Sequence, residues 1–409
     1  MQNKKKVAYT IVNNPYLHFA IALSESFISL HEDYEFKIYL LDSHLNRSKE
    51  LLSNVEIIEV DTEIIPDLNQ RAFYYDITEL STSIKPNIML DLLKSNYELV
   101  CYIDPDIKFF SRMSEVERSL EHNNFVVTPH ATTPIYDGKR PDDLNFLRTG
   151  AYNLGFIAVK NSSESIAFAN WWMQRLQYNG FSAYSAGTFT DQKWIDLLPS
   201  YFDGVHILKD PGYNVSYWNL HERDVQGEYE APFVNGRDLV FYHFSGINLK
   251  DNSISKYQTR FQDYPSETLS SIFSIYRKEC LKILEGINNS SIKYKSLADG
   301  SKIDSLSRML FFHHIINGYL GDVNPFSLNR KSLNKLLISD WSRYKSNIPT
   351  YYLDFRIESY GTKINRIPKF LKKAILNLAY SRFGEKILTS TNNSVNKINV
   401  SSLILRLTK

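Results

Sequence analysis

Two aspartates, Asp104 and Asp106, stand one residue apart directly after the apolar run at residues 99–103. A run of this kind predicts a buried strand, and functional groups gather at the carboxyl ends of strands in α/β proteins. Both carboxylates could therefore turn toward one divalent cation, and hard oxygen ligands suit Mg²⁺ or Mn²⁺. Such an ion can bridge the phosphates of a leaving nucleoside diphosphate. The alternative is a chance Asp-x-Asp pair, which a chain of this length readily contains.

Further short segments accompany this pair along the chain. They are Ser83-Ile84-Lys85-Pro86, Tyr152-Asn153-Leu154-Gly155-Phe156, Thr190-Asp191-Gln192-Lys193 and Tyr242-His243-Phe244-Ser245-Gly246. Together with the aspartates they resemble, in order and spacing, the core of family 8 and related retaining glycosyltransferases, including bacterial polysaccharide glycosyltransferases. Each segment alone is a weak signal, whereas the ordered series is a strong one. The resemblance covers roughly residues 5–250.

The resemblance implies a metal site made by Asp104, Asp106 and His243. These side chains would bind Mn²⁺ (or Mg²⁺), and a neutral imidazole suits Mn²⁺ better than Mg²⁺. The alternative for His243 is a hydrogen-bonded core histidine, because it stands in the apolar run at residues 239–244. Its place in the ordered series favours the metal ligand.

The resemblance also implies which residues hold a nucleotide-sugar donor and act in transfer. The donor contacts would be Lys85, Asn153, Asp104 and Gly246, and the catalytic positions would be Asp191 and Gln192. Gly246 would let the backbone approach the diphosphate closely. Simpler roles stay open: a solvated charge at a helix start for Lys85, a turn residue for Asn153 and a helix cap for Asp191.

Family 8 enzymes retain the anomeric configuration, so the resemblance favours retention, with Gln192 as a polar stabiliser. If configuration were inverted, Asp191 would be the candidate general base. Two departures from the family pattern stand out. Its Lys-Pro-Trp after the glycine is missing, with only Lys250 nearby, and residues 13–16 lack the acidic residue often found near the nucleobase. A UDP-sugar donor is therefore favoured by the resemblance alone.

A stretch dense in aromatic and amide side chains spans residues 212–221. Such groups stack on sugar faces and hydrogen-bond to hydroxyls. We therefore expect Tyr217 and Trp218 at the acceptor, which would be a glycan or a lipid-linked oligosaccharide. His130, just after the predicted strand at residues 125–128, is a third candidate. The alternative is a packed loop over the sheet.

Alternating strand and helix patterns must position these residues. Apolar runs predict strands at residues 7–12, 36–41, 55–60, 99–103, 125–128 and 156–159, with helical spacing at 19–30 and 84–93. Alternation of this kind predicts an α/β fold with a mostly parallel, mixed, Rossmann-like sheet flanked by helices, and the resemblance makes it the GT-A type. Strand patterns become scarce near residue 255. We expect a catalytic domain at residues 1–255 and a smaller, mainly helical region at residues 256–409.

The chain's end has a charge pattern of its own. Residues 360–409 contain ten lysines and arginines against a single glutamate, although the whole chain carries a net charge of only +2. The whole-chain value argues against nucleic acid as a partner. An amphipathic pattern at residues 366–386 would either contact an anionic membrane surface peripherally or pack on the catalytic domain. Two distant cysteines and the missing signal sequence predict a cytoplasmic protein, at the inner face of the membrane if this segment binds there.

These features together predict a metal-dependent glycosyltransferase, a hexosyltransferase of surface polysaccharide biosynthesis. Two other classes stay open. A non-catalytic component of a glycan assembly complex would bind a nucleotide-sugar or glycan without releasing nucleotide. A sugar nucleotidyltransferase would carry a glycine-rich phosphate loop after its first strand, and residues 12–16 contain no glycine.

Overall fold

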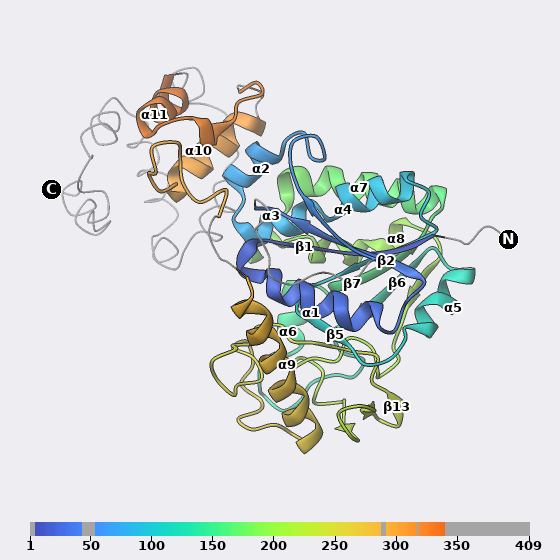
Figure 1. The fold of residues 1–409 in the computed structure, drawn as a ribbon. Coiled ribbons are helices and arrows are strands. Elements are labelled where there is room, and N and C mark those ends of the chain that lie inside the picture. The colour runs from blue at the N-terminus through green and yellow to red at the C-terminus, as the bar shows by residue number, and fades with distance from the viewer. Residues whose placement is uncertain (1–4, 43–53, 288–291, 317, 319, 340–409) are drawn as a thin grey trace. The chain divides into compact units, whose positions relative to one another are not determined.

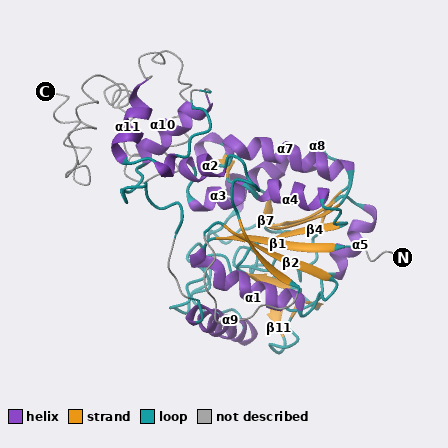
Figure 2. Ribbon diagram, turned by 45° about the horizontal axis from the view of Figure 1, so that its top comes forward, coloured by secondary structure: helices purple, strands orange, loops and turns teal. Residues whose placement is uncertain are grey.

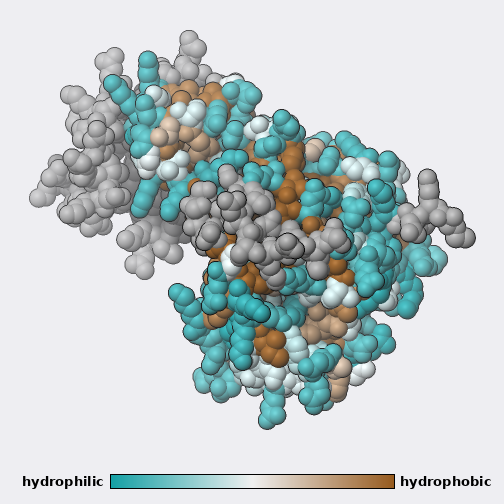
Figure 3. Space-filling model, viewed as in Figure 1, coloured by the Kyte–Doolittle hydropathy of each residue, from teal (hydrophilic) through white to brown (hydrophobic). Residues whose placement is uncertain are grey.

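The computed structural model describes residues 5–42, 54–287, 292–316, 318 and 320–339 (Figure 1). The chain divides into two compact units, Met1–Tyr294 and Lys295–Lys409. The predicted basic tail at residues 360–409 and its amphipathic segment at 366–386 lie outside the described residues. Among the described helices none is long and apolar enough to span a membrane. The face drawn in Figure 3 is mostly hydrophilic, with hydrophobic side chains visible in limited areas.

The first unit is built on a seven-stranded sheet with the order β10-β6-β7-β4-β1-β2-β3. Its strands are β1 (Lys6–Val12), β2 (Tyr34–Leu40), β3 (Val55–Glu59), β4 (Leu99–Ile103), β6 (Phe125–Pro129), β7 (Tyr152–Lys160) and β10 (Val205–Ile207). All neighbouring strands run parallel except β7, which is antiparallel to β4 and to β6. The predicted α/β fold with a mostly parallel, mixed sheet is thereby confirmed.

Helices cover both faces of this sheet (Figures 1 and 2). On one side lie α4 (Lys85–Lys94) and α7 (Ser163–Asn179), and on the other lies α1 (Leu17–Ile28). Because both faces are covered, the central strand β4 is buried along its whole length and reads as a continuous apolar run. The polar residues of the site can therefore begin only where such a strand ends.

Shorter elements connect and extend these layers. Those before the middle of the chain are η1 (Asn14–Tyr16), α2 (Leu68–Tyr74), α3 (Ile77–Ser83), β5 (Ile107–Phe109), α5 (Ser114–His122) and α6 (Asp143–Thr149). Those that follow are β8 (Ser182–Ala183), η2 (Tyr184–Ala186), β9 (Thr188–Phe189), η3 (Gln192–Leu197), α8 (Leu198–Tyr201), β11 (Val225–Gln226), β12 (Phe233–Val234), β13 (Arg237–Asp238) and β14 (Phe241–His243). The antiparallel pair of β5 and β14 forms a small sheet of its own.

Helix α9 (Glu267–Glu285) belongs to the first unit, although the sequence patterns placed it in the C-terminal region. Its Tyr276 stacks on Phe244 with ring centroids 3.8 Å apart, and its Phe273 meets Tyr242 edge-on at 5.3 Å. Aromatic contacts of this size bury α9 against the segment around β14. The unit boundary after Tyr294 therefore differs from the predicted boundary at residue 255.

The described part of the second unit is helical. It contains α10 (Ser305–Ile316), η4 (Pro325–Ser327) and α11 (Arg330–Ser339). The imidazole Nε2 of His314 lies 3.0 Å from the Leu337 carbonyl, and Leu333 and Leu337 are buried. These contacts hold α10 and α11 together.

Candidate metal and donor site

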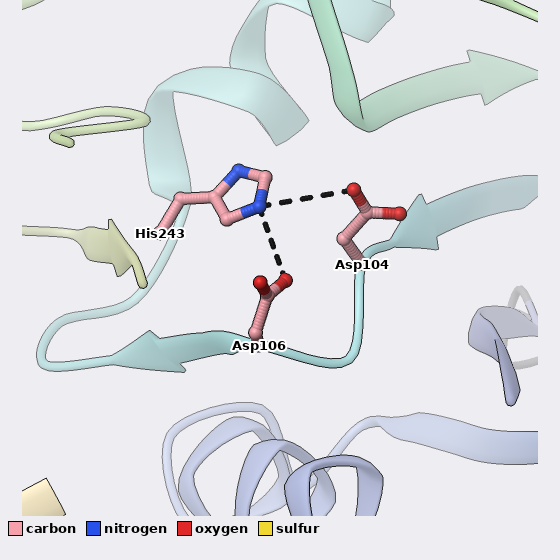
Figure 4. Close-up of side chains that lie close together, drawn as sticks. All are labelled: Asp104, Asp106 and His243. Atoms are coloured by element: carbon pink, nitrogen blue, oxygen red, sulfur yellow. Dashed lines mark ion pairs between the residues drawn. The ribbon is translucent and has the colours of Figure 1, made fainter. Parts of the chain in front are cut away.

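Strand pairing brings the two aspartates and the histidine together. Asp104 and Asp106 lie between the end of β4 and the start of β5, and β5 pairs with β14 so that His243 stands opposite Ile107. The His243 Nε2 atom is 3.1 Å from the Asp106 Oδ1 and 3.8 Å from the Asp104 Oδ2 (Figure 4). One ligand atom from each residue lies within 4.8 Å of the others. The three predicted metal ligands thus converge on one point.

Asn153, at the start of β7, orients the His243 ring. Its Oδ1 accepts a hydrogen bond from the backbone N–H of Gly155 at 3.1 Å, which identifies this atom as the oxygen. The His243 Nδ1, 3.2 Å from the same oxygen, must then carry the proton. When the ring is neutral, the opposite nitrogen, Nε2, carries the lone pair and faces the two carboxylates, as a metal ligand requires.

Gly155 makes room for this histidine. A Cβ built on Gly155 would lie 2.4 Å from the His243 Cε1 and 2.7 Å from its Nδ1. Every other residue type would therefore push the ring away from the carboxylates. In the sequence, Gly155 stands in the segment Tyr152-Asn153-Leu154-Gly155-Phe156, which does not by itself indicate this role.

Lys85 is a buried cation next to the aspartates. Its Nζ is 2.8 Å from the Asp191 Oδ2 and 3.6 Å from the Asp104 Oδ1, and it lies 3.9 Å from the centre of the Tyr102 ring. It also donates to the Leu154 carbonyl at 3.0 Å. Lys85 is only 2% exposed, so the reading as a solvated charge at a helix start is wrong.

The charges of the cluster are unbalanced without a further cation. Asp104, Asp106 and Asp191 face the single lysine Lys85, which leaves two negative charges if His243 is neutral. Burial lowers the pKa of the His243 imidazole, but the charge and hydrogen bond of Asp106 and the charge of Asp104 outweigh it and raise this pKa. Burial raises the pKa of the Asp191 carboxyl, against the nearby Lys85. A divalent cation held by Asp104, Asp106 and His243 would balance these charges, so the residues fit such an ion.

Gln192 is fully engaged with the backbone. Its Oε1 accepts from the Leu154 N–H at 3.0 Å, and its Nε2 donates to the Thr149 carbonyl at 2.9 Å. Thr190, two residues before Gln192, adopts a left-handed backbone with φ of 46°, and its hydroxyl donates to the Asp191 Oδ1. Such strain is common where a site dictates the backbone. In this arrangement Gln192 holds the backbone at the start of β7, and Asp191 faces Lys85.

Asn214 is a buried site residue that the sequence analysis did not single out. Its Nδ2 donates to the Asn153 Oδ1 at 3.0 Å and to the Thr128 hydroxyl at 2.7 Å. The only sequence signal was its place in the amide-rich stretch at residues 212–221. Its φ of 52° belongs to the left-handed region, which asparagine tolerates better than most residues.

The three predicted acceptor residues lie together but are not equally accessible. His130 and Trp218 are 6% and 3% exposed, whereas Tyr217 is partly exposed. Burial lowers the pKa of His130 to about 4, so its imidazole is neutral and can accept from the Asn153 Nδ2 at 3.3 Å. The Trp218 ring meets the His243 ring edge-on at 5.1 Å. His130 thus contacts Asn153, and Trp218 packs against His243.

A pocket of 430 Å³ opens between η1 and the segment that follows β14. It is lined by Tyr16, His18, Phe19, Gly246, Ile247, Asn248, Leu249, Asp251, Ser253 and Lys256. Gly246, three residues after His243, has a φ of 73°, which glycine adopts without strain. Lys256 lines this pocket, whereas Lys250 is not among its lining residues.

Arg277 of α9 holds the wall of this pocket in place. Its guanidinium donates to the Asn248 carbonyl at 3.2 Å, to the Ser253 carbonyl at 2.6 Å and to the Tyr264 hydroxyl at 2.7 Å. The residue is 7% exposed. The packing of α9 within the first unit therefore shapes this pocket.

Comparisons with known proteins give relatives without an assigned activity. No protein-family model matches the sequence. The uncharacterized proteins YfnF and YfnD of Bacillus subtilis (strain 168) are similar to it. YfnF is 26% identical over 249 residues, 59% of this chain and 81% of its own length. YfnD is 25% identical over 310 residues, 69% of this chain and 94% of its own length.

Solved structures of glycosyltransferases are also similar in part. The galactosyltransferase LgtC, in complex with donor and acceptor sugar analogues, matches at 12% identity and a TM-score of 0.37, over 70% of this chain and 98% of that one. A glycosyltransferase involved in the glycosylation of the major capsid of PBCV-1 matches at 12% identity and a TM-score of 0.34, over 59% of this chain and 94% of that one. Similarity at this level assigns no activity to this protein.

Proposed function

We propose that this protein is a metal-dependent glycosyltransferase that transfers a sugar from a nucleotide-sugar to a glycan or lipid-linked acceptor. The observation that carries this proposal is the convergence of Asp104, Asp106 and His243 beside the pocket that contains Lys256. Two carboxylates and one neutral imidazole, which offers its Nε2 lone pair, form a ligand set for a hard or borderline divalent ion.

The ion would be Mn²⁺ or Mg²⁺, and when bound it would neutralise negative charge on the diphosphate of the donor. The chain supplies the rest of the environment. Asn153 holds His243 in the ligating tautomer, and Lys85 places a positive charge next to Asp104 and Asp191. Preorganised charges of this kind stabilise a transition state in which negative charge develops on the leaving group.

The nucleotide would occupy the pocket of 430 Å³. Tyr16 is half exposed at its rim and offers a ring face for a base, and Lys256 offers a cation for a phosphate. Gly246 lines this pocket in a left-handed backbone that glycine adopts without strain, so its backbone would be available to a diphosphate there. The resemblance noted in the sequence favours a UDP-sugar among nucleotide-sugars.

Asp191 is the carboxylate nearest to Lys85, and its raised pKa suits a group that exchanges a proton. Gln192 would act through the backbone of Leu154 and not as a nucleophile. Retention of configuration remains our proposal from the sequence resemblance. The biological setting we propose is surface polysaccharide biosynthesis in the cytoplasm.

The decisive experiment is nucleotide release from a panel of UDP- and GDP-sugars with Mn²⁺, with Mg²⁺ or with EDTA. We expect release from one donor, lost in EDTA and in Asp106→Asn. Asp203→Asn, which changes an exposed aspartate after α8, is the matched control. Release that persists in EDTA and in Asp106→Asn would refute the metal-dependent mechanism. Tight binding of a nucleotide-sugar with no release of nucleotide, even after candidate acceptors are added, would instead support a binding component of a glycan assembly complex.

A further inference from the structure

A row of aromatic rings leads away from the candidate metal site. It starts at Tyr257, whose ring would lie 2.6 Å from a Cβ on Gly246 and therefore rests on that glycine. The successive ring centroids are separated by 6.4 Å, 5.0 Å, 5.4 Å and 5.2 Å along the series Tyr257, Tyr217, Trp218, His130 and Phe146. The far end, Phe146 of α6, lines a second pocket of 280 Å³.

Two tyrosines at the start of this row are open to solvent. Tyr257 is 55% exposed, and Tyr217, 6.4 Å away from ring to ring, is partly exposed. Open tyrosine rings thus lie beside Gly246, although rings of this size normally bury their faces.

Buried polar groups in the same row lack partners. The indole Nε1–H of Trp218 makes no hydrogen bond within the described part of the chain, although the residue is 3% exposed. An unpaired buried donor costs on the order of 1–3 kcal/mol.

We propose that Tyr217 and Tyr257 form the acceptor site and bind a pyranose ring of a glycan. This inference rests on the proposed glycosyltransferase activity, because the ring row starts at the residues that would hold the donor. The C–H face of a pyranose packs on a tyrosine ring, while its hydroxyls reach phenolic and backbone groups. The second pocket, at the far end of the row, would hold a more distant part of the acceptor.

The lining of that second pocket agrees with a neutral polar ligand. It combines apolar side chains with two carboxylates and one ammonium group, from Asp143, Phe146, Leu147, Ala151, Lys193 and Asp196. Lys193 is paired with Asp196 at 2.6 Å, and Asp196 also accepts from the Ala151 N–H. A phosphorylated or strongly anionic ligand would find no free cation among these lining residues, whereas a sugar needs none.

The test measures binding of methyl pyranosides (glucoside, galactoside and N-acetylglucosaminide) by saturation-transfer NMR and calorimetry. It uses the full chain in EDTA without nucleotide, so binding does not depend on turnover. We expect one pyranoside to bind the wild type and to bind about five- to tenfold more weakly to Tyr257→Ala. Tyr257→Phe keeps the ring and should keep most of the affinity, which also guards against misfolding of the alanine variant.

Tyr201→Ala is the matched control, because Tyr201 is 57% exposed but lies on α8. Equal affinity of wild type and Tyr257→Ala would overturn the acceptor site, and so would no binding of any pyranoside. If nucleotide release succeeds while Tyr257→Ala binds the pyranoside normally, only the acceptor site is wrong. If Tyr257→Ala loses pyranoside binding while no donor is turned over by the wild type, the sugar site stands and the enzymatic proposal falls.

Discussion

The Nδ1–H of His243 donates to the Oδ1 of Asn153 over 3.2 Å, and this bond decides which nitrogen of the ring faces the carboxylates. The same oxygen accepts from the Gly155 N–H and from the Asn214 amide, so its position is fixed from three sides. Outer hydrogen bonds of this type orient metal ligands and raise their basicity. The asparagine thus supports the proposed metal site without touching the ion.

We predict that Asn153→Ala weakens Mn²⁺ binding by about 10–100-fold, because His243 loses the acceptor that fixes its tautomer. Calorimetric titration with Mn²⁺ measures this effect. Asn170→Ala is the control, since the Asn170 amide donates to the Ile166 carbonyl within α7, away from the site. Wild-type affinity in Asn153→Ala would mean that the ring is held by packing alone.

Gly155→Ala should remove most of the metal affinity, by at least about tenfold, without unfolding the protein. The added Cβ would overlap the His243 ring at 2.4 Å, and the ring must turn away from Asp106. Gly321→Ala is the control, because nothing lies within 4 Å of its added Cβ. Manganese titration together with circular dichroism distinguishes lost binding from lost structure. An alanine variant that binds Mn²⁺ normally would show that His243 is not a ligand.

The sequence predicted the strands that carry the site better than the long-range contacts that bring its residues together. Residues 7–12 and 99–103 were predicted as strands and are β1 (Lys6–Val12) and β4 (Leu99–Ile103), because buried parallel strands are continuous apolar runs. Asp104 and Asp106 could be located for the same reason, at the end of such a run. Local patterns of this kind need no knowledge of the rest of the chain.

Long-range pairing was beyond these local patterns. The register of β5 with β14 brings His243 to the aspartates, yet each strand has only three residues and no readable alternation. The packing of α9 on Phe244 was missed similarly, since helical spacing predicts a helix but not the surface it contacts. Asn214 was missed because a left-handed turn residue resembles any other loop asparagine in sequence.

Lys85→Met should lower the free energy of unfolding by about 3–5 kcal/mol, because the buried Asp191 carboxylate loses its cation. Lys85 and Asp191 are 2% exposed each and 2.8 Å apart. In the double variant Lys85→Met/Asp191→Asn the loss should be smaller than the sum of the single losses. Urea unfolding of the wild type, Lys85→Met, Asp191→Asn and the double variant gives the coupling free energy between the two residues. Strictly additive losses would contradict a direct ion pair.

The pH dependence of stability should report the buried histidine His31, which follows α1. Its Nδ1 donates to the Phe27 carbonyl at 2.8 Å, and its Nε2 accepts from the Met113 N–H at 3.0 Å. Burial lowers the pKa of this imidazole from 6.5 to about 4. Between these two pKa values the unfolded chain binds a proton that the folded chain excludes, so the free energy of unfolding falls as the pH falls.

The lowered pKa of His31 should therefore reduce the free energy of unfolding by about 2 kcal/mol when the pH falls from 7 to 5. His31→Gln has no titrating ring, and we expect its stability to change less by this amount over the same range. Urea unfolding of both proteins at pH 7 and pH 5 measures the difference, and the other buried histidines cancel in the comparison. An identical pH dependence in the two proteins would mean that the His31 ring takes up its proton as readily in the folded chain as in the unfolded one.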